Sequence, residues 1–191
     1  MVKKATIGFA MCGSFCTFSK AYEQMQVLAK DGYELVPIMS ENAANTDTRF
    51  GTAEENRLRA EKITGSRVLC TKVDTEPLGP RDICDMLVIA PCTGNTLAKL
   101  SLGVTDTAVT MAAKSLLRVG KPVLICAATN DALGASAQNI GRLLNTKNIF
   151  FVPLAQDDHK NKPNSLVADF ELIPKCVTKA LGKEQLQPVL V

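Results

Sequence analysis

The sequence lacks the long apolar runs and charge blocks that mark membrane-spanning and nucleic-acid-binding proteins. Its 191 residues carry a net charge of +3 from 22 basic and 19 acidic side chains, which are scattered along the chain. No apolar run reaches the roughly 18 residues that a transmembrane helix needs. The basic and apolar start, Met1 to Met11, superficially resembles a signal peptide, but Gly8 interrupts it, and a buried first strand fits better. We therefore expect a soluble protein without a nucleic-acid or membrane partner.

Paired cysteine motifs are missing as well. The seven cysteines are an odd number and include no C-x-x-C pair, and several fall within apolar, strand-like runs. This pattern favours free thiols in a reducing, cytoplasmic setting over a disulfide framework. We also expect no metal site.

Short apolar runs alternate with longer segments of helical period, which is typical of parallel strands joined by crossover helices. The runs are continuous, as in strands covered on both faces. The predicted strands are Ala5 to Ala10, Glu34 to Met39, Val68 to Thr71, Met86 to Ala90, Val123 to Ala127 and Ile149 to Pro153. The predicted helices are Ser19 to Lys30, Thr52 to Ile63, a buried Asp106 to Val119, Ala135 to Leu144, and Leu166 to Leu181 with a kink or break at Pro174.

These elements predict an α/β fold, a doubly wound parallel sheet in three α/β/α layers, formed by one domain over residues 1–191. We expect loops at Ser40 to Gly51 and at Gln156 to Asn164, on the side where such folds bind ligands. The segment 182–191 is predicted to be a flexible or partner-contacting tail.

Small polar residues follow the first two strands. Gly13 permits a close approach of the backbone, and Ser14 is either a helix cap or a hydrogen-bond donor to an anion. Ser40 either completes a phosphate pocket with Ser14 or caps a helix. The G-x-G-x-x-G fingerprint is absent, which disfavours ordinary dinucleotide binding.

The most informative segment follows the fourth predicted strand. Pro91-Cys92-Thr93-Gly94-Asn95-Thr96 leaves a buried strand and opens a helix, and Gly103-Val104-Thr105-Asp106 comes shortly after it. Free backbone N–H groups and short polar side chains at this position suit a phosphate or a flat heteroaromatic ring.

Taken together, these turns resemble the flavoprotein family of homo-oligomeric flavin-containing cysteine decarboxylases. The family motifs read approximately G-x-T-G-S-I-A, P-A-T-A-N-T, G-x-A-D-N-L and P-A-M-N. The matching residues are Gly13, Ser14, Pro91, Thr93, Asn95, Thr96, Gly103, Asp106 and Asn130. The resemblance runs from about Thr6 to Asn145 and implies a Rossmann-like flavoprotein fold, FMN as cofactor and a homo-oligomer of three or more subunits.

The resemblance also implies a role for each residue. The FMN phosphate would lie over Gly13, Ser14 and Ser40, and Pro91 belongs to the same cofactor-binding set. Thr93, Asn95 and Thr96 would contact the phosphate, the ribityl chain or the ring edge. Asp106 would brace the turn, and Asn130 would face the substrate.

Two departures from the family pattern argue against a decarboxylase. The histidine that decarboxylases use as an acid/base is absent, since the only histidine here is His159, which we interpret as a solvated loop residue. The P-A-M-N-x-x-M-W loop appears as Ala127 to Gly134, without proline or tryptophan.

Cys12, Cys16 and Cys92 are either small apolar filler or redox thiols, and we favour filler because no basic residue adjoins them in sequence.

Within the family, the chain is most similar to the small subunit of a two-component oxidoreductase of sporulation. That resemblance implies a larger partner subunit that binds NADP, and oxidation of a dihydropyridine dicarboxylate to the aromatic pyridine dicarboxylate. Candidate cations for the dicarboxylate are Lys99, Arg142, Lys160 and Lys162. The alternatives are an FMN-dependent decarboxylase or prenyltransferase of the same fold, and a non-catalytic assembly subunit that has lost the cofactor. The residue that transfers the proton is unknown.

Overall fold

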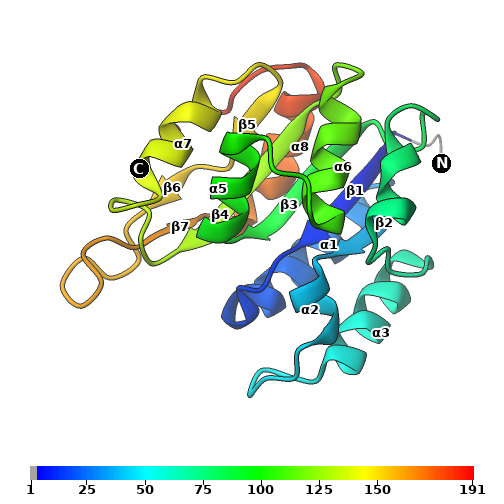
Figure 1. The fold of residues 1–191 in the computed structure, drawn as a ribbon, viewed down its shortest axis with the longest axis horizontal. Helices are drawn as coiled ribbons and strands as arrows, with labels where there is room; N and C mark the ends of the chain where they lie inside the picture. The colour runs from blue at the N-terminus through cyan, green and yellow to red at the C-terminus, as the bar shows by residue number, and fades with distance from the viewer. Residues whose placement is uncertain (1–3) are drawn as a thin grey trace.

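The computed structural model describes residues 4–191 and has a parallel central sheet (Figure 1). Its first four strands are β1 (Thr6–Met11), β2 (Glu34–Met39), β3 (Met86–Cys92) and β4 (Val123–Thr129). They lie in the order β2-β1-β3-β4, and all three neighbouring pairs are parallel. Every residue of β1 and β3 is buried, as expected for strands covered on both faces. The predicted doubly wound α/β class is confirmed.

Two strands share the far edge of β4. The strand β5 (Ile149–Phe151) pairs in parallel with the start of β4, and β7 (Leu166–Ala168) pairs antiparallel with its end. The short β6 (Leu154–Ala155) pairs antiparallel with β7. The sheet is therefore mixed at this edge, which the alternating sequence pattern did not predict.

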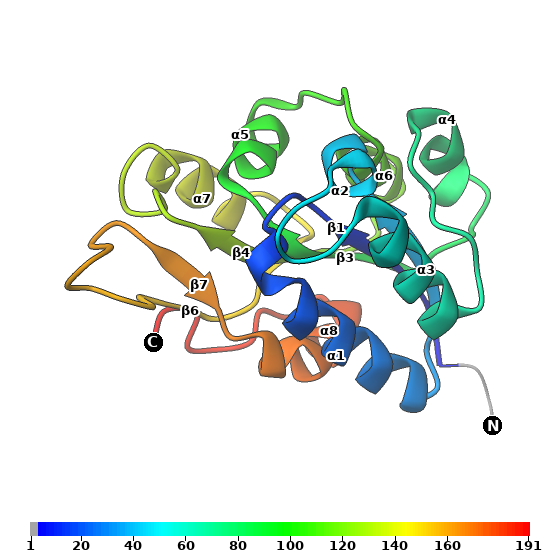
Figure 2. The same cartoon turned by 90° about the horizontal axis from the view of Figure 1, so that it is seen from below.

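Helices cover both faces of the sheet (Figure 2). On one face lie α1 (Phe18–Lys30) and α8 (Ile173–Leu181). The helices on the other face are α2 (Glu41–Asn45), α4 (Lys72–Thr75), α5 (Gly94–Leu102), α6 (Ala108–Leu117) and α7 (Ala137–Leu144). The helix α3 (Ala53–Thr64) contacts both α1 and α2 beside β2.

Local signals account for the helices that were predicted well. Thr52 and Glu55 form a reciprocal capping box at the start of α3, and Gly65 ends the helix with φ +69°. The predicted buried helix is α6, in which Ala108, Val109, Ala112, Ala113 and Leu116 are all buried. No helix within residues 4–191 has both the length and the apolar character needed to cross a membrane.

Three element predictions are wrong. The segment 68–71 is not a regular strand, because only Leu69 forms a bridge, to Ile38, and Thr71 instead caps α4 in a capping box with Asp74. The segment 166–181 is not one helix, because β7 occupies its start and Pro174 lies in the first turn of α8, where a missing N–H costs nothing. The predicted loop 40–51 contains the short helix α2.

The segment 182–191 packs against the sheet. Leu186 is buried, and the backbone near Val189 and Val191 hydrogen-bonds with that of Leu154. The Gln185 side chain accepts a hydrogen bond from the Phe151 backbone N–H at 2.8 Å and donates one to the Phe151 carbonyl at 2.7 Å. Gln185 thus satisfies the edge of β5 in the way that a neighbouring strand would.

This pairing yields a stability prediction. Gln185→Ala should lower the free energy of unfolding by about 1–3 kcal/mol, because it leaves the backbone N–H and carbonyl of the buried Phe151 without this partner. Chemical denaturation measures the change, with Gln138→Ala at an exposed position of α7 as the matched control. Equal unfolding midpoints for the two variants would contradict the role given to Gln185.

Candidate functional site

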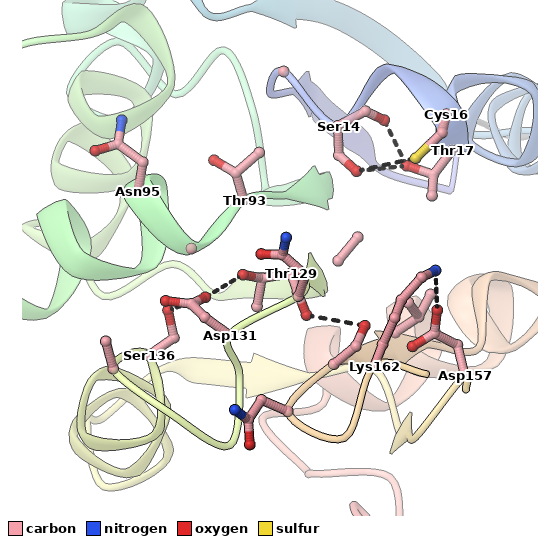
Figure 3. A pocket seen from close by; sticks show the side chains of 18 of the residues that line it. Ser14, Cys16, Thr17, Thr93, Asn95, Thr129, Asp131, Ser136, Asp157 and Lys162 are labelled. Carbon is pink, nitrogen blue, oxygen red and sulfur yellow. Dashed lines mark hydrogen bonds and ion pairs between the residues drawn. The ribbon is translucent and has the colours of Figure 1, made fainter. Parts of the chain in front are cut away.

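A cavity of about 1100 Å³ opens at the edge of the sheet where β1, β3 and β4 end. Its walls come from the turns that follow these three strands and from the loop between β6 and β7 (Figure 3). Strand order explains the meeting, because neighbouring parallel strands end at the same edge. The residues that line it include Gly13, Ser14, Cys16, Thr17, Thr93, Gly94, Asn95, Thr129, Asn130, Asp131, Ser136, Asp157, Asn161, Lys162 and Ser165.

Five predicted site residues meet in this cavity, namely Gly13, Ser14, Thr93, Asn95 and Asn130. The Ser14 side chain does not cap the helical turn that follows it. Its hydroxyl takes part in two long contacts: it accepts a hydrogen bond from Thr17 at 3.4 Å and shares one with the Cys16 sulfur at 3.9 Å. A Cβ added to Gly13 would make a tight contact, 3.0 Å from Nδ2 of the exposed Asn42 side chain.

Asn95 and Asn130 are the polar groups most available to a ligand. Both are exposed, and neither side-chain amide makes a hydrogen bond within residues 4–191. Each amide offers both donors and an acceptor. They come from different elements, Asn95 from the first turn of α5 and Asn130 from the turn that follows β4.

Four predicted site residues do not line the cavity. Ser40 is buried and caps α2, accepting a hydrogen bond from the Ala43 N–H at 3.2 Å, so the capping alternative describes its contacts. Pro91 is buried within β3. Thr96 is buried and donates to the Cys12 sulfur at 3.3 Å, beneath the turn. Asp106 pairs with Lys99 at 2.9 Å and so ties the loop before α6 to α5, outside the cavity.

Sequence reasoning missed a cluster of polar residues around Asp131. The Asp131 carboxylate accepts hydrogen bonds from the Thr129 hydroxyl at 2.5 Å and the Ser136 hydroxyl at 2.9 Å. These hydrogen bonds, that from Thr129 above all, lower the pKa of Asp131. The signal available in the sequence was that Thr129 and Asp131 flank Asn130 at a strand end.

The Asp131 cluster packs directly against the start of α5. A Cβ added to Gly94 would lie 2.7 Å from Thr129 Oγ1, 2.8 Å from Ser136 Oγ and 2.9 Å from Asp131 Oδ1. The family motif P-A-T-A-N-T has alanine at this position, and the glycine here makes room for the cluster. An ionised carboxylate beside a helix N-terminus is also favourable to the helix dipole.

The cysteines divide between the cavity and the core. Cys16 is exposed and lines the cavity, whereas Cys12 and Cys92 are buried below it. Burial raises the pKa of the Cys92 thiol well above its ordinary value. A thiol held neutral in this way is a poor nucleophile, which agrees with the interpretation of Cys92 as small apolar filler.

The loop between β6 and β7 completes the wall opposite Ser14. Lys162 pairs with Asp157 at 3.3 Å, and a hydrogen bond from Ser165, followed by one from Lys162, lowers the pKa of Asp157. The only histidine, His159, lies exposed on this loop and does not line the cavity, so its predicted solvated position is confirmed.

Comparison with known proteins places the chain in a family. The family model described as Flavoprotein matches residues 1–180. The chain belongs to the flavoprotein family. It is 45% identical over its whole length to the B subunit of dipicolinate synthase from Bacillus subtilis (strain 168), covering 95% of that protein.

Solved structures of this family share the fold. The crystal structure of the dipicolinate synthase B subunit from Bacillus halodurans C superimposes with a TM-score of 0.91 at 42% identity, covering 99% of this chain and 97% of that one. The FMN-dependent cysteine decarboxylase SpaF has a TM-score of 0.67 at 22% identity, with 95% and 97% coverage. At that identity the likeness to SpaF shows the fold alone. The resemblance to the flavoprotein family inferred from the turns is confirmed.

The packing of Gly94 predicts that alanine substitution changes the free energy of unfolding in opposite directions at Gly94 and Gly141. Gly94→Ala should lower the free energy of unfolding by about 1–3 kcal/mol, because the new methyl group collides with three polar atoms. Gly141→Ala, in α7 with no heavy atom within 4 Å of the added Cβ, should raise it by about 0.5–1 kcal/mol. Thermal and chemical denaturation measure both, and stabilisation by Gly94→Ala would refute the close packing.

The Asp131 hydrogen bonds lead to a pH-dependent stability difference. The pKa of Asp131 is lower in the folded than in the unfolded chain. The ionised carboxylate therefore stabilises the fold at any pH above its ordinary pKa of 3.8. That contribution is lost as the pH falls through the folded pKa. At pH 7, Asp131→Asn should lower the free energy of unfolding by about 1 kcal/mol, a small effect because Asp131 is partly exposed to water. The difference in stability between wild type and variant should shrink as the pH falls below 3.8 and vanish below the folded pKa, whereas a difference constant with pH would contradict this account.

Proposed function

We propose that this chain is the flavin-binding small subunit of a dipicolinate synthase. It acts with a larger NADP-binding subunit to oxidise a dihydrodipicolinate-type precursor to dipicolinate during sporulation. The observation that carries the proposal is the convergence of three strand-end turns, with the free amides of Asn95 and Asn130, on one cavity. Similarity to the B subunits of two dipicolinate synthases along almost the entire chain supports the specific reaction.

The cavity fits FMN in size and in chemistry. Its volume of about 1100 Å³ exceeds what a cofactor of this size fills, and so leaves room for a second ligand. The Gly13–Ser14 turn would hold the phosphate, Thr93 and Asn95 the ribityl chain or the ring edge, and Asn130 would face the substrate. FMN supplies a two-electron acceptor when it is bound.

The proposed reaction removes one hydride and one proton from a dihydropyridine ring and leaves the aromatic pyridine. A hydride moves only when donor and acceptor are held face to face, so the role of this chain is to position the two rings. The amides of Asn95 and Asn130 are suited to this task because they can hydrogen-bond to ring edges from two sides of the cavity. The hydride acceptor for the overall reaction is the flavin here or the NADP of the partner.

A decarboxylase function has less support. No histidine lies in the cavity wall, because the only one in the sequence, His159, is on the part of the β6–β7 loop outside the cavity lining. The cavity carboxylate nearest the β4 end, Asp131, is already engaged by two hydroxyl groups. We further propose that the protein is cytoplasmic and forms a homo-oligomer of three or more subunits.

Flavin binding tests the first half of the proposal. The purified chain should bind added FMN and quench its fluorescence, and Asn95→Ala should weaken binding by about tenfold through loss of one or two hydrogen bonds. Asn145→Ala, at the exposed end of α7 and outside the cavity, is the matched control. Equal affinities for the two variants would remove Asn95 from the flavin site.

Reconstitution tests the second half. Dipicolinate formation should rise when the chain is added to the larger subunit with NADP and the dihydro precursor. Formation at the same rate with the larger subunit alone would refute the assignment. Wild-type chain that remains colourless and leaves FMN fluorescence unchanged would instead favour the non-catalytic assembly subunit.

A further inference from the structure

The cavity wall contains one cationic side chain among the residues that the structure describes. Of the four cations considered for a dicarboxylate, only Lys162 lines the cavity. Lys99 is engaged with Asp106, and the Arg142 guanidinium donates to the Ser101 carbonyl at 3.2 Å. Lys160 is exposed on the same loop as Lys162 but outside the cavity lining.

The backbone around Lys162 is held by local hydrogen bonds. The Lys162 N–H donates to the Asp158 carbonyl at 2.7 Å, and the Ser165 N–H donates to the Lys162 carbonyl at 3.0 Å. The Asn161 side chain donates to both Asp158 carboxylate oxygens, at 3.1 and 3.0 Å. These hydrogen bonds fix the backbone from which the Lys162 side chain extends at the cavity wall.

The ammonium group of Lys162 is available to a ligand. Its present partner is Asp157 at 3.3 Å, and the two side chains keep 56% and 30% of their surface exposed. Exposed ion pairs of this kind are weak, so a ligand carboxylate can compete for the ammonium. Figure 3 shows Lys162 and Asp157 across the cavity from Ser14 and Thr17. A cation in that position is separated from the turn that would take a cofactor phosphate.

Charge balance makes this lysine important. The other ionisable side chains in the described lining are the carboxylates of Asp131 and Asp157, apart from the Cys16 thiol. A doubly charged ligand entering beside two carboxylates would be repelled unless a cation offsets the charge. Among the lining residues of the described chain, Lys162 alone provides one.

We propose that Lys162 is the residue that selects a carboxylate-bearing substrate, by pairing with one carboxylate of a pyridine dicarboxylate bound in the cavity. This inference rests on the proposed function and deepens it, since it assigns the specificity for the charged substrate to one side chain. The group recognised is a ligand carboxylate, and the competing source of the same negative charge is the phosphate of FMN.

The test compares a charged with a neutral ligand of the same shape. Pyridine-2,6-dicarboxylate and pyridine-2,6-dicarboxamide are titrated into the FMN-supplemented chain by calorimetry. The wild type should prefer the dicarboxylate. Lys162→Gln should weaken dicarboxylate binding by about tenfold and change the affinity for the dicarboxamide by no more than about twofold. Lys162→Arg should restore the preference, and Lys160→Gln is the matched control on the same loop.

The outcomes separate the two proposals. If the wild type prefers the dicarboxylate and Lys162→Gln keeps that preference, the role of Lys162 is refuted while the proposed function stands. If Lys162→Gln instead loses affinity for FMN, the lysine serves the cofactor phosphate and the inference is wrong. A wild type that binds neither pyridine ligand while it binds FMN would refute the substrate assignment, and the inference with it.

Discussion

Parallel pairing of β1, β3 and β4 is the constraint on which the rest of the structure depends. These strands are buried, and their register brings Met11, Cys92 and Thr129 to one edge of the sheet. The turns that follow them are close in space although the sequence separates them by many residues. Without this pairing, Ser14, Asn95 and Asn130 would share no cavity.

The Asp131 cluster links the cavity to the stability of the fold. It joins the end of β4 to the start of α7 through Ser136 and packs against the first residue of α5. The Asp131 carboxylate lies close to Gly94, at the first residue of α5. At the start of α5, the side chains of the N-cap Thr93 and of Asn95 line the cavity.

Some elements could be predicted from the sequence because local interactions decide them. The strand β2 has the predicted bounds, and α3 follows from Thr52 at its start and Gly65 at its end. The segment 68–71 could not be predicted, because the choice between a strand and a cap depends on how much of the β2 edge is free. The strand β7 also depends on tertiary contact, since its partner is the end of β4.

The site residues also divide into those that a local pattern predicts and those that depend on tertiary contacts. Five of the predicted residues line the cavity, because strand-end position alone brings them there. Ser40 and Thr96 share this strand-end pattern but bond within the protein. Ser40 caps α2, which is one of its two predicted alternatives. Thr96 donates to the Cys12 sulfur, a long-range contact that no local signal reveals. The contacts of Gly94 with Thr129, Asp131 and Ser136, and the place of Lys162 in the wall, arise from long-range packing and required the structure.

The most direct test of the account is a crystal structure of the chain grown with saturating FMN. The account predicts the phosphate at the Gly13–Ser14 turn and the ring system between Asn95 and Asn130. Flavin bound at another face of the molecule, or a clear structure of this cavity without flavin at saturating concentration, would contradict it.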